Sequence, residues 1–261
     1  MSETNGKRPA RQPQTEWAIT RDQYDAVLLD LDGVITDTAR IHAACWKQMF
    51  DEYLQRRATE GGEAFRPFDI APDYRLYVDG KPRYDGVRDF LASRGIRLRE
   101  GSPDDSPQAE TVDGLGNRKN ELVNNMIADV GVEAYDGSVR LIRQLGRRGF
   151  KIAVVTSSQN CDMVLRAAKL DGYFEVRVDG NMIHARHLAG KPAPDAFLVA
   201  AELLRVEPAR AVVIEDAISG VEAGTNGNFG LVIGVARKGN AEELRHHGAH
   251  LVVNDLGELV D

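Results

Sequence analysis

The chain is poor in cysteine, in long apolar runs and in positive charge. Only two of its 261 residues, Cys45 and Cys161, are cysteine, so we expect neither a disulfide framework nor a cysteine metal site. No apolar run reaches the length of a membrane span, which argues against a membrane partner. The formal net charge is -7 and no basic stripe is present, which argues against nucleic acid. This composition fits a reducing, cytoplasmic compartment.

The first 20 residues are polar and contain Pro9 and Pro13 without an apolar segment. They favour a disordered tail at 1–20 over a secretory signal. The chain as a whole is 43% hydrophobic. At its length, it can therefore bury one large domain, or a core domain with a second domain inserted into it.

From Tyr135 onward, short apolar runs alternate with amphipathic stretches. The sequence predicts strands at 151–155, 211–214, 231–235 and 251–253. It predicts helices at roughly 137–148, 160–170, 193–204, 219–226 and 240–247. This alternation is typical of βαβ units. It predicts an α/β fold with a Rossmann-like parallel sheet that helices cover on both faces.

Between residues 38 and 134 the sequence is instead rich in helical patterns. A Gly/Pro/Asp-rich stretch at 101–116 predicts a long loop within this segment. We interpret 38–134 as a helical cap inserted into an α/β core made of 21–37 and 135–261. The two joints fall near 34–38 and 133–137, where Tyr135-Asp136-Gly137 favours a turn.

Two aspartates, Asp30 and Asp32, follow the apolar run 27–29 and precede Gly33. Side chains two residues apart on an extended segment point the same way, so both carboxylates would face one small volume at a strand end. One carboxylate can attack as a nucleophile while the other moves a proton, and Mg²⁺ is a natural counter-ion for the pair. The alternative is a solvated Asp-Leu-Asp-Gly turn.

A hydroxyl-rich turn follows the predicted strand at 151–155 and leads into a helix. It reads Thr156-Ser157-Ser158-Gln159-Asn160. Its hydroxyls and free N–H groups can hold phosphate oxygens. A surface helix cap is the alternative interpretation.

Two further motifs stand near strand ends in the second half of the chain. Lys191 lies between glycine and proline in the segment 190–194, whose two prolines fix the backbone before a helix. Glu215 and Asp216 follow the strand at 211–214 and offer oxygen ligands to a divalent metal. An exposed lysine and a solvated acidic turn are the alternatives.

Taken in order, these four motifs resemble those of the haloacid dehalogenase superfamily, and the resemblance spans residues 25–261. It implies that Asp30 receives the phosphoryl group as an aspartyl phosphate and that Asp32 is the general acid and base. It assigns Thr156 and Lys191 to the transferring phosphoryl group. Phosphoryl transfer depends mostly on positioning and charge neutralisation, which these residue types can supply.

The same resemblance implies a Mg²⁺ site. Its ligands would be the Asp30 carboxylate, the Asp32 backbone carbonyl, Glu215 and Asp216.

The segment 30–39, followed by His42, resembles the β-phosphoglucomutase family within that superfamily. This resemblance implies that Thr38 and His42 bind or orient the acid/base Asp32. The alternative for His42 is a histidine that only packs in a helix.

Two segments of the cap resemble the sugar-phosphate-binding segments of the same family. The loop 78–83, which includes Gly80, implies that Arg83 holds the phosphate that is not transferred. Lys119 and Asn120 would contact the sugar phosphate. A solvated charged face is the alternative for these cap residues.

The core turn adds Ser157, Ser158 and Asn160 to the same distal phosphate site. Two features depart from the family pattern. Gln159 stands where the family has a lysine, which removes one cation from the distal site. The loop at 101–116 also lengthens the cap.

The resemblance implies a Mg²⁺-dependent interconversion of β-glucose 1-phosphate and glucose 6-phosphate through glucose 1,6-bisphosphate. The expected partner is a small phosphorylated sugar, and the expected state is a monomer. A sugar-phosphate phosphatase, in which water accepts the phosphoryl group, is one alternative. A non-catalytic phosphosugar-binding regulator is another, but the intact pair Asp30 and Asp32 weighs against it.

Overall fold

The computed structural model describes residues 19–62 and 64–261. The tail predicted at 1–20 therefore lies outside the described residues up to position 18. Ile19 is only 7% exposed and belongs to the main hydrophobic core. The folded chain thus includes residues 19 and 20, ahead of the predicted core boundary at 21.

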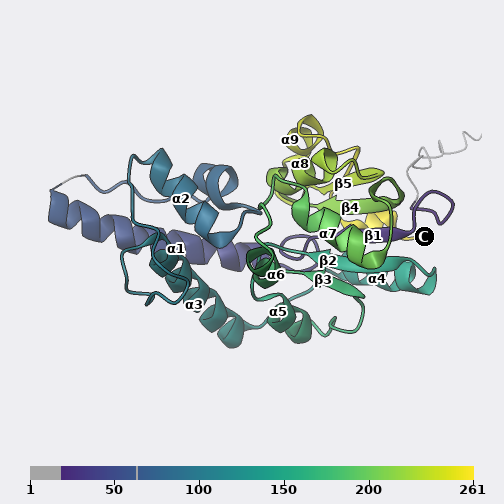
Figure 1. Cartoon of the computed structure of the whole chain (residues 1–261), viewed down its shortest axis with the longest axis horizontal. Helices are drawn as coiled ribbons and strands as arrows, with labels where there is room; N and C mark the ends of the chain where they lie inside the picture. Colours follow the sequence, from purple (N-terminus) through teal and green to yellow (C-terminus); the bar gives the residue numbers. More distant parts are fainter. Residues whose placement is uncertain (1–18, 63) are drawn as a thin grey trace, which may run out of the picture.

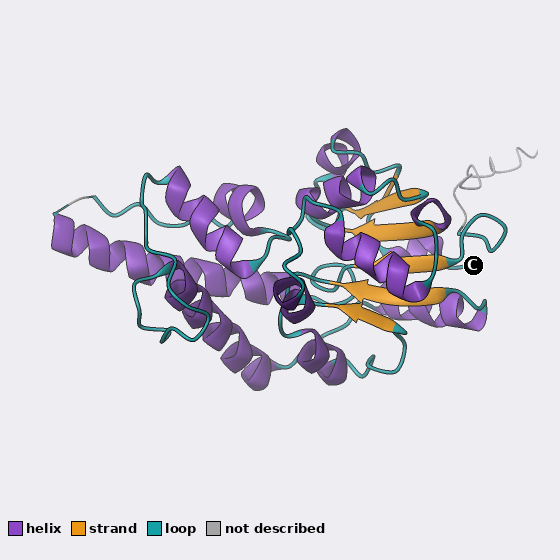
Figure 2. Cartoon of the chain, in the orientation of Figure 1, coloured by secondary structure: helices purple, strands orange, loops and turns teal. Residues whose placement is uncertain are grey.

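A six-stranded parallel sheet forms the centre of the larger half of the molecule, in the order β3-β2-β1-β4-β5-β6 (Figures 1 and 2). This confirms the predicted α/β fold. The strands are β1 (Ala26–Leu29), β2 (Lys151–Val155), β3 (Val176–Val178), β4 (Ala211–Glu215), β5 (Leu231–Val235) and β6 (Leu251–Val253).

Helices cover both faces of this sheet, as its apolar strands require. Alternate strand residues point to opposite faces: Val27 and Leu29 join one core cluster, whereas Ala26 and Leu28 join the other. The first cluster packs against α4 (Asp136–Arg147) and α5 (Cys161–Ala167). The second packs against α6 (Gly180–Ala185), α7 (Asp195–Leu204), α8 (Ile218–Asn226) and α9 (Ala241–His246). Two 3₁₀ turns, η2 (Pro208–Arg210) and η3 (Leu256–Leu259), complete this half.

The segment between β1 and α4 is helical and has its own hydrophobic core. It contains α1 (Thr38–Gly61), the π-helical turn η1 (Tyr74–Val78), α2 (Arg83–Ser93) and α3 (Val112–Val130). Their apolar faces meet in a cluster built around Trp46, Phe50, Phe68 and Phe90. In Figure 1 this segment extends away from the sheet, with α1 as its longest element. We infer from this separate core that 38–134 is a cap.

The loop predicted at 101–116 is shorter than expected. Helix α3 begins at Val112, because Thr111 caps it by accepting a hydrogen bond from the Gly114 N–H at 2.9 Å. The residues 112–116 are therefore helical, and two of the three glycines that suggested a loop, Gly114 and Gly116, lie inside the first two turns.

The two chain connections of the cap lie side by side. Thr36 and Ala134 form an antiparallel bridge. The Asp37 N–H donates to Glu133 O at 2.9 Å, and the Tyr135 N–H donates to Ile35 O at 3.0 Å. The cap therefore leaves and re-enters the core through one short two-stranded contact.

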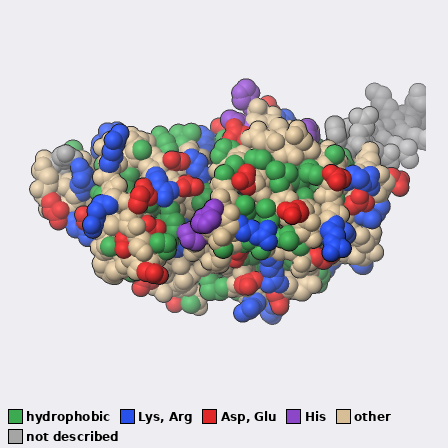
Figure 3. Space-filling model, in the orientation of Figure 1, with side chains coloured by type: hydrophobic (Ala, Val, Ile, Leu, Met, Phe, Trp, Pro, Cys, Tyr) green, Lys and Arg blue, Asp and Glu red, His purple; other side chains and the backbone are tan. Residues whose placement is uncertain are grey.

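Charged side chains of both signs are interspersed on the face shown in Figure 3. None of the helices in the described part of the chain is long and apolar enough to cross a membrane.

Candidate active site

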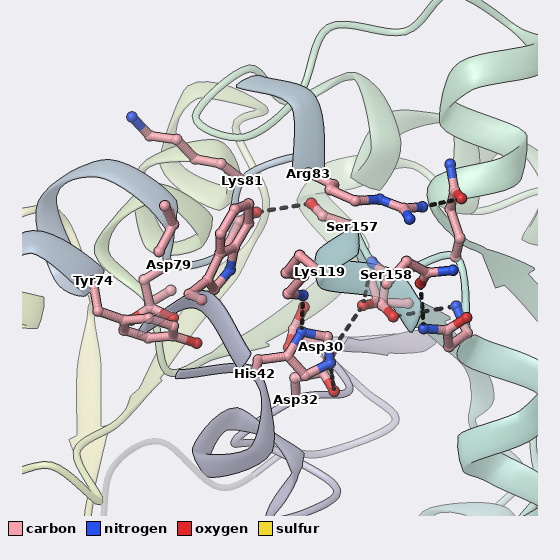
Figure 4. Close-up of a pocket in the computed structure, with 18 of the residues that line it drawn as sticks. Asp30, Asp32, His42, Tyr74, Asp79, Lys81, Arg83, Lys119, Ser157 and Ser158 are labelled. Carbon is pink, nitrogen blue, oxygen red and sulfur yellow. Dashed lines mark hydrogen bonds and ion pairs between the residues drawn. The ribbon is translucent and has the colours of Figure 1, made fainter. Parts of the chain in front are cut away.

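A cavity lies between the carboxyl ends of the central strands and the cap (Figure 4). Every predicted site residue lines it except Thr38, Lys191 and Glu215, which lie beneath its surface. The lining residues from the prediction are Asp30, Asp32, His42, Gly80, Arg83, Lys119, Asn120, Thr156, Ser157, Ser158, Gln159, Asn160 and Asp216.

Strand register explains why the core motifs meet. Leu29, the last residue of β1, pairs with both β2 and β4. Asp30 consequently lies level with Glu215, and Thr156 and Asp216 follow one residue further along their chains. Parallel strands bring all four positions to the same edge of the sheet.

Lys191 is buried against the carboxylate of Asp30. Its ammonium donates to Asp30 Oδ1 at 2.7 Å and to Glu215 Oε1 at 2.5 Å, and its side chain is only 1% exposed. Burial alone would lower the pKa of Lys191, but the two carboxylates raise it, so the ammonium stays charged. Burial raises the pKa of Asp30 well above its usual range, and Lys191 opposes that rise only in part.

Asp32 faces a different set of partners. Strand β1 ends before the aspartates, and Asp32 turns toward the first turn of the cap helix α1. Its Oδ1 accepts a hydrogen bond from the Thr38 hydroxyl, and its Oδ2 accepts one from the Thr156 hydroxyl at 3.3 Å. Asp30 and Asp32 thus line one cavity but are held separately, rather than as a parallel pair on one strand.

His42 lies between Asp32 and Lys119. Its Nδ1 is 2.7 Å from Lys119 Nζ, and its Nε2 is 3.5 Å from Asp32 Oδ1 (Figure 4). Burial and the Lys119 charge lower the pKa of His42 to about 4, so the ring is neutral near pH 7. Since Nδ1 accepts from the lysine, we assign the ring proton to Nε2, which faces Asp32.

Lys119 is a buried cation of the cap. Burial, followed by the Arg83 charge, lowers the pKa of its ammonium to about 7. The ammonium also lies 5.0 Å from the centre of the Trp46 ring. A nearby anion would favour its charged form.

Arg83 stands at the far end of the cavity from Lys191. Among the residues that the structure describes, its hydrogen-bond acceptors are uncharged oxygens: its Nη2 donates to Gln159 Oε1, and its Nη1 donates to Gly116 O at 3.4 Å. Burial lowers the pKa of Arg83. A half-buried guanidinium held by neutral acceptors is suited to an incoming anion.

Hydrogen bonds join the cap to the core turn beside this arginine. Asn160 Nδ2 donates to Asn120 Oδ1 at 2.9 Å, and Ser157 Oγ donates to Gly80 O at 2.8 Å. Ser158 Oγ accepts a hydrogen bond from the Asn160 N–H at 3.2 Å, so this hydroxyl stabilises the turn and makes no contact with the cap through this bond. The predicted substrate residues of cap and core are therefore in direct contact.

The carboxylates beside Lys191 fit a divalent cation. Oxygens of Asp30, Glu215 and Asp216 all lie within 4.8 Å of one another. Asp216 Oδ2 is buried and accepts no hydrogen bond. Gly33 has φ 93°, and a Cβ there would lie 2.3 Å from Asp216 Oδ2, so the backbone next to Asp32 approaches this oxygen closely. These three buried carboxylates face two ammonium groups, Lys191 and the partly exposed Lys238, which favours a further cation with oxygen ligands.

Glu215 differs from the other two acids in its surroundings. Its Oε1 accepts from Lys191, while its Oε2 accepts from the backbone N–H groups of Asp216 at 3.1 Å and Ala217 at 3.3 Å. Both oxygens already have donors, so Asp30 and Asp216 are the more open ligands. The Asp32 carboxylate is not part of this cluster, and only the family resemblance assigns its backbone carbonyl to a metal.

Sequence analysis missed two residues of this region. Lys238, three residues beyond the end of β5, lies 3.0 Å from Asp216 Oδ2 and 3.1 Å from Asp79 Oδ2. Asp79, in the cap loop, lines the cavity beside Tyr74 (Figure 4). The sequence offered one indication of Lys238: it closely follows the strand predicted at 231–235, where site residues are expected.

The family model for haloacid dehalogenase-like hydrolases matches residues 24–228. The chain therefore belongs to the haloacid dehalogenase-like hydrolase family. Its fold and the order of its motifs agree with this assignment.

Several relatives within the family are named β-phosphoglucomutase. One, from Mycobacterium tuberculosis, is 54% identical over 242 residues, which are 92% of this chain and 92% of the relative. Another, from Bacillus subtilis, is 32% identical over 235 residues and covers 90% of this chain and 91% of the relative. These relatives confirm the resemblance inferred from the sequence.

A crystal structure of β-phosphoglucomutase from Clostridium difficile has the same fold. Its TM-score is 0.70 at 24% sequence identity, and the match covers 90% of this chain and 93% of that one. At this identity, the likeness bears on the fold alone.

Proposed function

We propose that this protein is a Mg²⁺-dependent β-phosphoglucomutase. It would interconvert β-glucose 1-phosphate and glucose 6-phosphate through an aspartyl phosphate and glucose 1,6-bisphosphate. The observation that carries this proposal is one cavity with a buried nucleophile–lysine pair at one end and an arginine with neutral partners at the other. The names of the relatives support the same conclusion.

The first step is attack by Asp30 on a phosphoryl group of the bisphosphate. A bond forms between a carboxylate oxygen and phosphorus, and the bond from phosphorus to the sugar oxygen breaks. Lys191, which touches Asp30 at 2.7 Å, neutralises part of the charge on the transferring group. Mg²⁺, when bound by the Asp30 and Asp216 carboxylates and the Asp32 carbonyl, would neutralise further charge and align the phosphoryl oxygens.

Asp32 would transfer the proton in each direction. As an acid it protonates the departing sugar oxygen, and as a base it takes the proton of the sugar hydroxyl that attacks the aspartyl phosphate. Thr38 and Thr156 each donate a hydrogen bond to one oxygen of Asp32, and together they fix the orientation of the Asp32 carboxylate. His42 and Lys119 extend this network into the cap.

The opposite end of the cavity would hold the phosphate that is not transferred. Arg83, Lys119 and Asn120 come from the cap, whereas Ser158, Gln159 and Asn160 come from the core. Because the intermediate carries a phosphate at each end, it can bind in two orientations, each with one phosphate at Asp30. One chain supplies all of these groups, which supports action as a monomer.

A coupled assay with β-glucose 1-phosphate tests this proposal. We expect Mg²⁺-dependent formation of glucose 6-phosphate that requires a catalytic amount of glucose 1,6-bisphosphate. Asp30→Asn should abolish it while leaving the circular dichroism spectrum unchanged, because the substitution removes the nucleophile but little volume. Release of inorganic phosphate without isomerisation would identify a phosphatase instead, and residual turnover in Asp30→Asn would exclude the covalent mechanism.

A further inference from the structure

Lys238 is a cation shared between the core and the cap. It follows β5, and its ammonium lies 3.0 Å from Asp216 Oδ2, in the core, and 3.1 Å from Asp79 Oδ2, in the cap loop. The Asp216 and Asp79 side chains are 4% and 11% exposed, so both charges are nearly buried. Without a cation between them, two carboxylates this close would repel each other.

The contact with Asp216 is an ion pair without hydrogen-bond geometry. Lys238 donates a hydrogen bond to Asp79, whereas Asp216 Oδ2 accepts none. The ammonium thus acts on Asp216 as a charge in close contact, at 3.0 Å from Oδ2. A second cation at this oxygen would compete with the ammonium for it.

The cap loop that carries Asp79 is otherwise attached to the core by its backbone. Ser219 Oγ donates to Asp79 O at 3.0 Å, and Ser157 Oγ donates to Gly80 O at 2.8 Å. A Cβ on Gly80 would lie 2.5 Å from Ser219 Oγ, so glycine permits this close approach. Lys238 therefore adds the charged contact to a loop that already rests on the core.

We propose that Lys238 is a positioning residue that sets the Mg²⁺ affinity of Asp216 and links it to the position of the cap loop. With no metal at Asp216, the ammonium compensates the charges of Asp216 and Asp79 together. Mg²⁺ at Asp216 supplies that compensation in the core. A Mg²⁺ ion there would also repel the Lys238 ammonium, which would weaken the charged contact of the cap loop with the core. This inference rests on the metal site of the proposed function.

The test measures Mg²⁺ binding by isothermal titration calorimetry without sugar and without turnover. Lys238→Met removes a positive charge a few ångströms from the metal, so we expect binding at least about fivefold tighter than wild type. Asp79→Asn leaves Lys238 with Asp216 alone, so we expect binding roughly threefold weaker or more. Lys238→Arg keeps the positive charge, so its Mg²⁺ affinity should stay close to that of wild type.

Arg75 offers a matched control. It forms another ion pair between cap and core, with Glu243 at 2.8 Å, but this pair is exposed and involves no carboxylate of the metal cluster. Arg75→Met should therefore leave Mg²⁺ affinity unchanged. If Lys238→Met and Asp79→Asn changed the affinity in the same direction, or not at all, the role assigned to Lys238 would be wrong.

Hydrogen–deuterium exchange of peptides covering 74–82 reads out the cap loop directly. In wild type, Mg²⁺ should increase exchange there; in Lys238→Met, exchange should be high without metal and insensitive to it.

Mg²⁺ binding to Asp216→Asn separates the metal-site proposal from the role of Lys238. If this substitution leaves Mg²⁺ affinity unchanged, the proposed metal site and the role of Lys238 both fail. If it abolishes binding while Lys238→Met has no effect, only the role of Lys238 fails.

Discussion

The Arg83 guanidinium, carried by the first turn of α2 in the cap, donates a hydrogen bond to the side-chain oxygen of Gln159 in the core. Gln159 occupies the position at which the sequence resemblance leads us to expect a lysine. A lysine there would repel the arginine in the absence of a ligand, whereas glutamine offers it an acceptor. Glutamine at this position thus removes a positive charge that could bind phosphate and adds a hydrogen bond between the cap and the core.

Arg83→Ala should lower the mutase kcat/KM by at least about a hundredfold, as expected for a charge-assisted contact worth roughly 3 kcal/mol. Phosphorylation of Asp30 by acetyl phosphate, which has no distal phosphate, should change little. Arg88→Ala is the control, since Arg88 lies on the same helix but pairs with Asp85 and Glu100 at the surface. An equal loss of both activities in Arg83→Ala would make Arg83 a structural residue of the cap.

Thr38→Val should lower kcat by about tenfold or more, because the isosteric side chain cannot donate to Asp32 Oδ1 and the carboxylate loses its fixed orientation. KM for the sugar phosphate should stay close to that of wild type. Thr59→Val is the control on the same helix, where the hydroxyl bonds only to the Gln55 carbonyl. A kcat within about twofold of wild type would remove Thr38 from the proposed mechanism.

Mg²⁺ should raise the melting temperature, because the folded chain gathers the carboxylates that we propose as its ligands. At a concentration about a hundred times the Kd, ligand linkage stabilises by about 2.7 kcal/mol, which corresponds to a shift on the order of 5 °C. Asp216→Asn should abolish most of this shift, whereas Glu222→Gln, at a surface pair with His247, should retain it. A full shift in Asp216→Asn would place the metal elsewhere.

Lys119 makes stability depend on pH in the alkaline range. Its folded-state pKa is about 7 against 10.5 for the free side chain, so between these values the unfolded chain binds more protons. The free energy of unfolding should therefore rise with pH from about 7 to 10.5. Relative to Lys119→Met, the wild type should gain roughly 1 kcal/mol per pH unit there.

Urea unfolding at several pH values between 7 and 10 would measure this difference. Lys47→Met serves as the control, because Lys47 is partly exposed, pairs with Asp51 on α1 and should not alter the slope. Parallel stability curves for wild type and Lys119→Met would show that Lys119 titrates normally.

The central strands could be predicted because their residues are buried on both faces and read as continuous apolar runs. Strand β3 was missed because Val176-Arg177-Val178 is only three residues long, has a charged residue at its centre and lies at the sheet edge. Helix α6, which follows it, is only six residues long and shows no clear period. Short elements carry too little pattern to separate them from loops.

The core of the site could be predicted from the positions of polar residues at strand ends. The pairings across the cavity could not, because they depend on where the cap rests. Lys238 looks like an ordinary surface lysine until the fold brings Asp79 to it from a segment far away in the chain. For the same reason, Gln159 reads as a lost charge in the sequence, while its acceptance of a bond from Arg83 appears only in the folded molecule.

The bridge between Thr36 and Ala134 has a consequence for how such a protein can change over evolutionary time. Because the two ends of the insertion already touch, a turn of a few residues could close the gap they leave, with little loss of chain entropy. Most of the sheet's core comes from the sheet and its own helices, and the inserted segment adds Ile41, Cys45, Val123 and Ile127, which a replacement would have to match. Substitution of one whole insertion for another would then alter which sugar is accepted, while the sheet residues proposed to transfer the phosphoryl group stay in place.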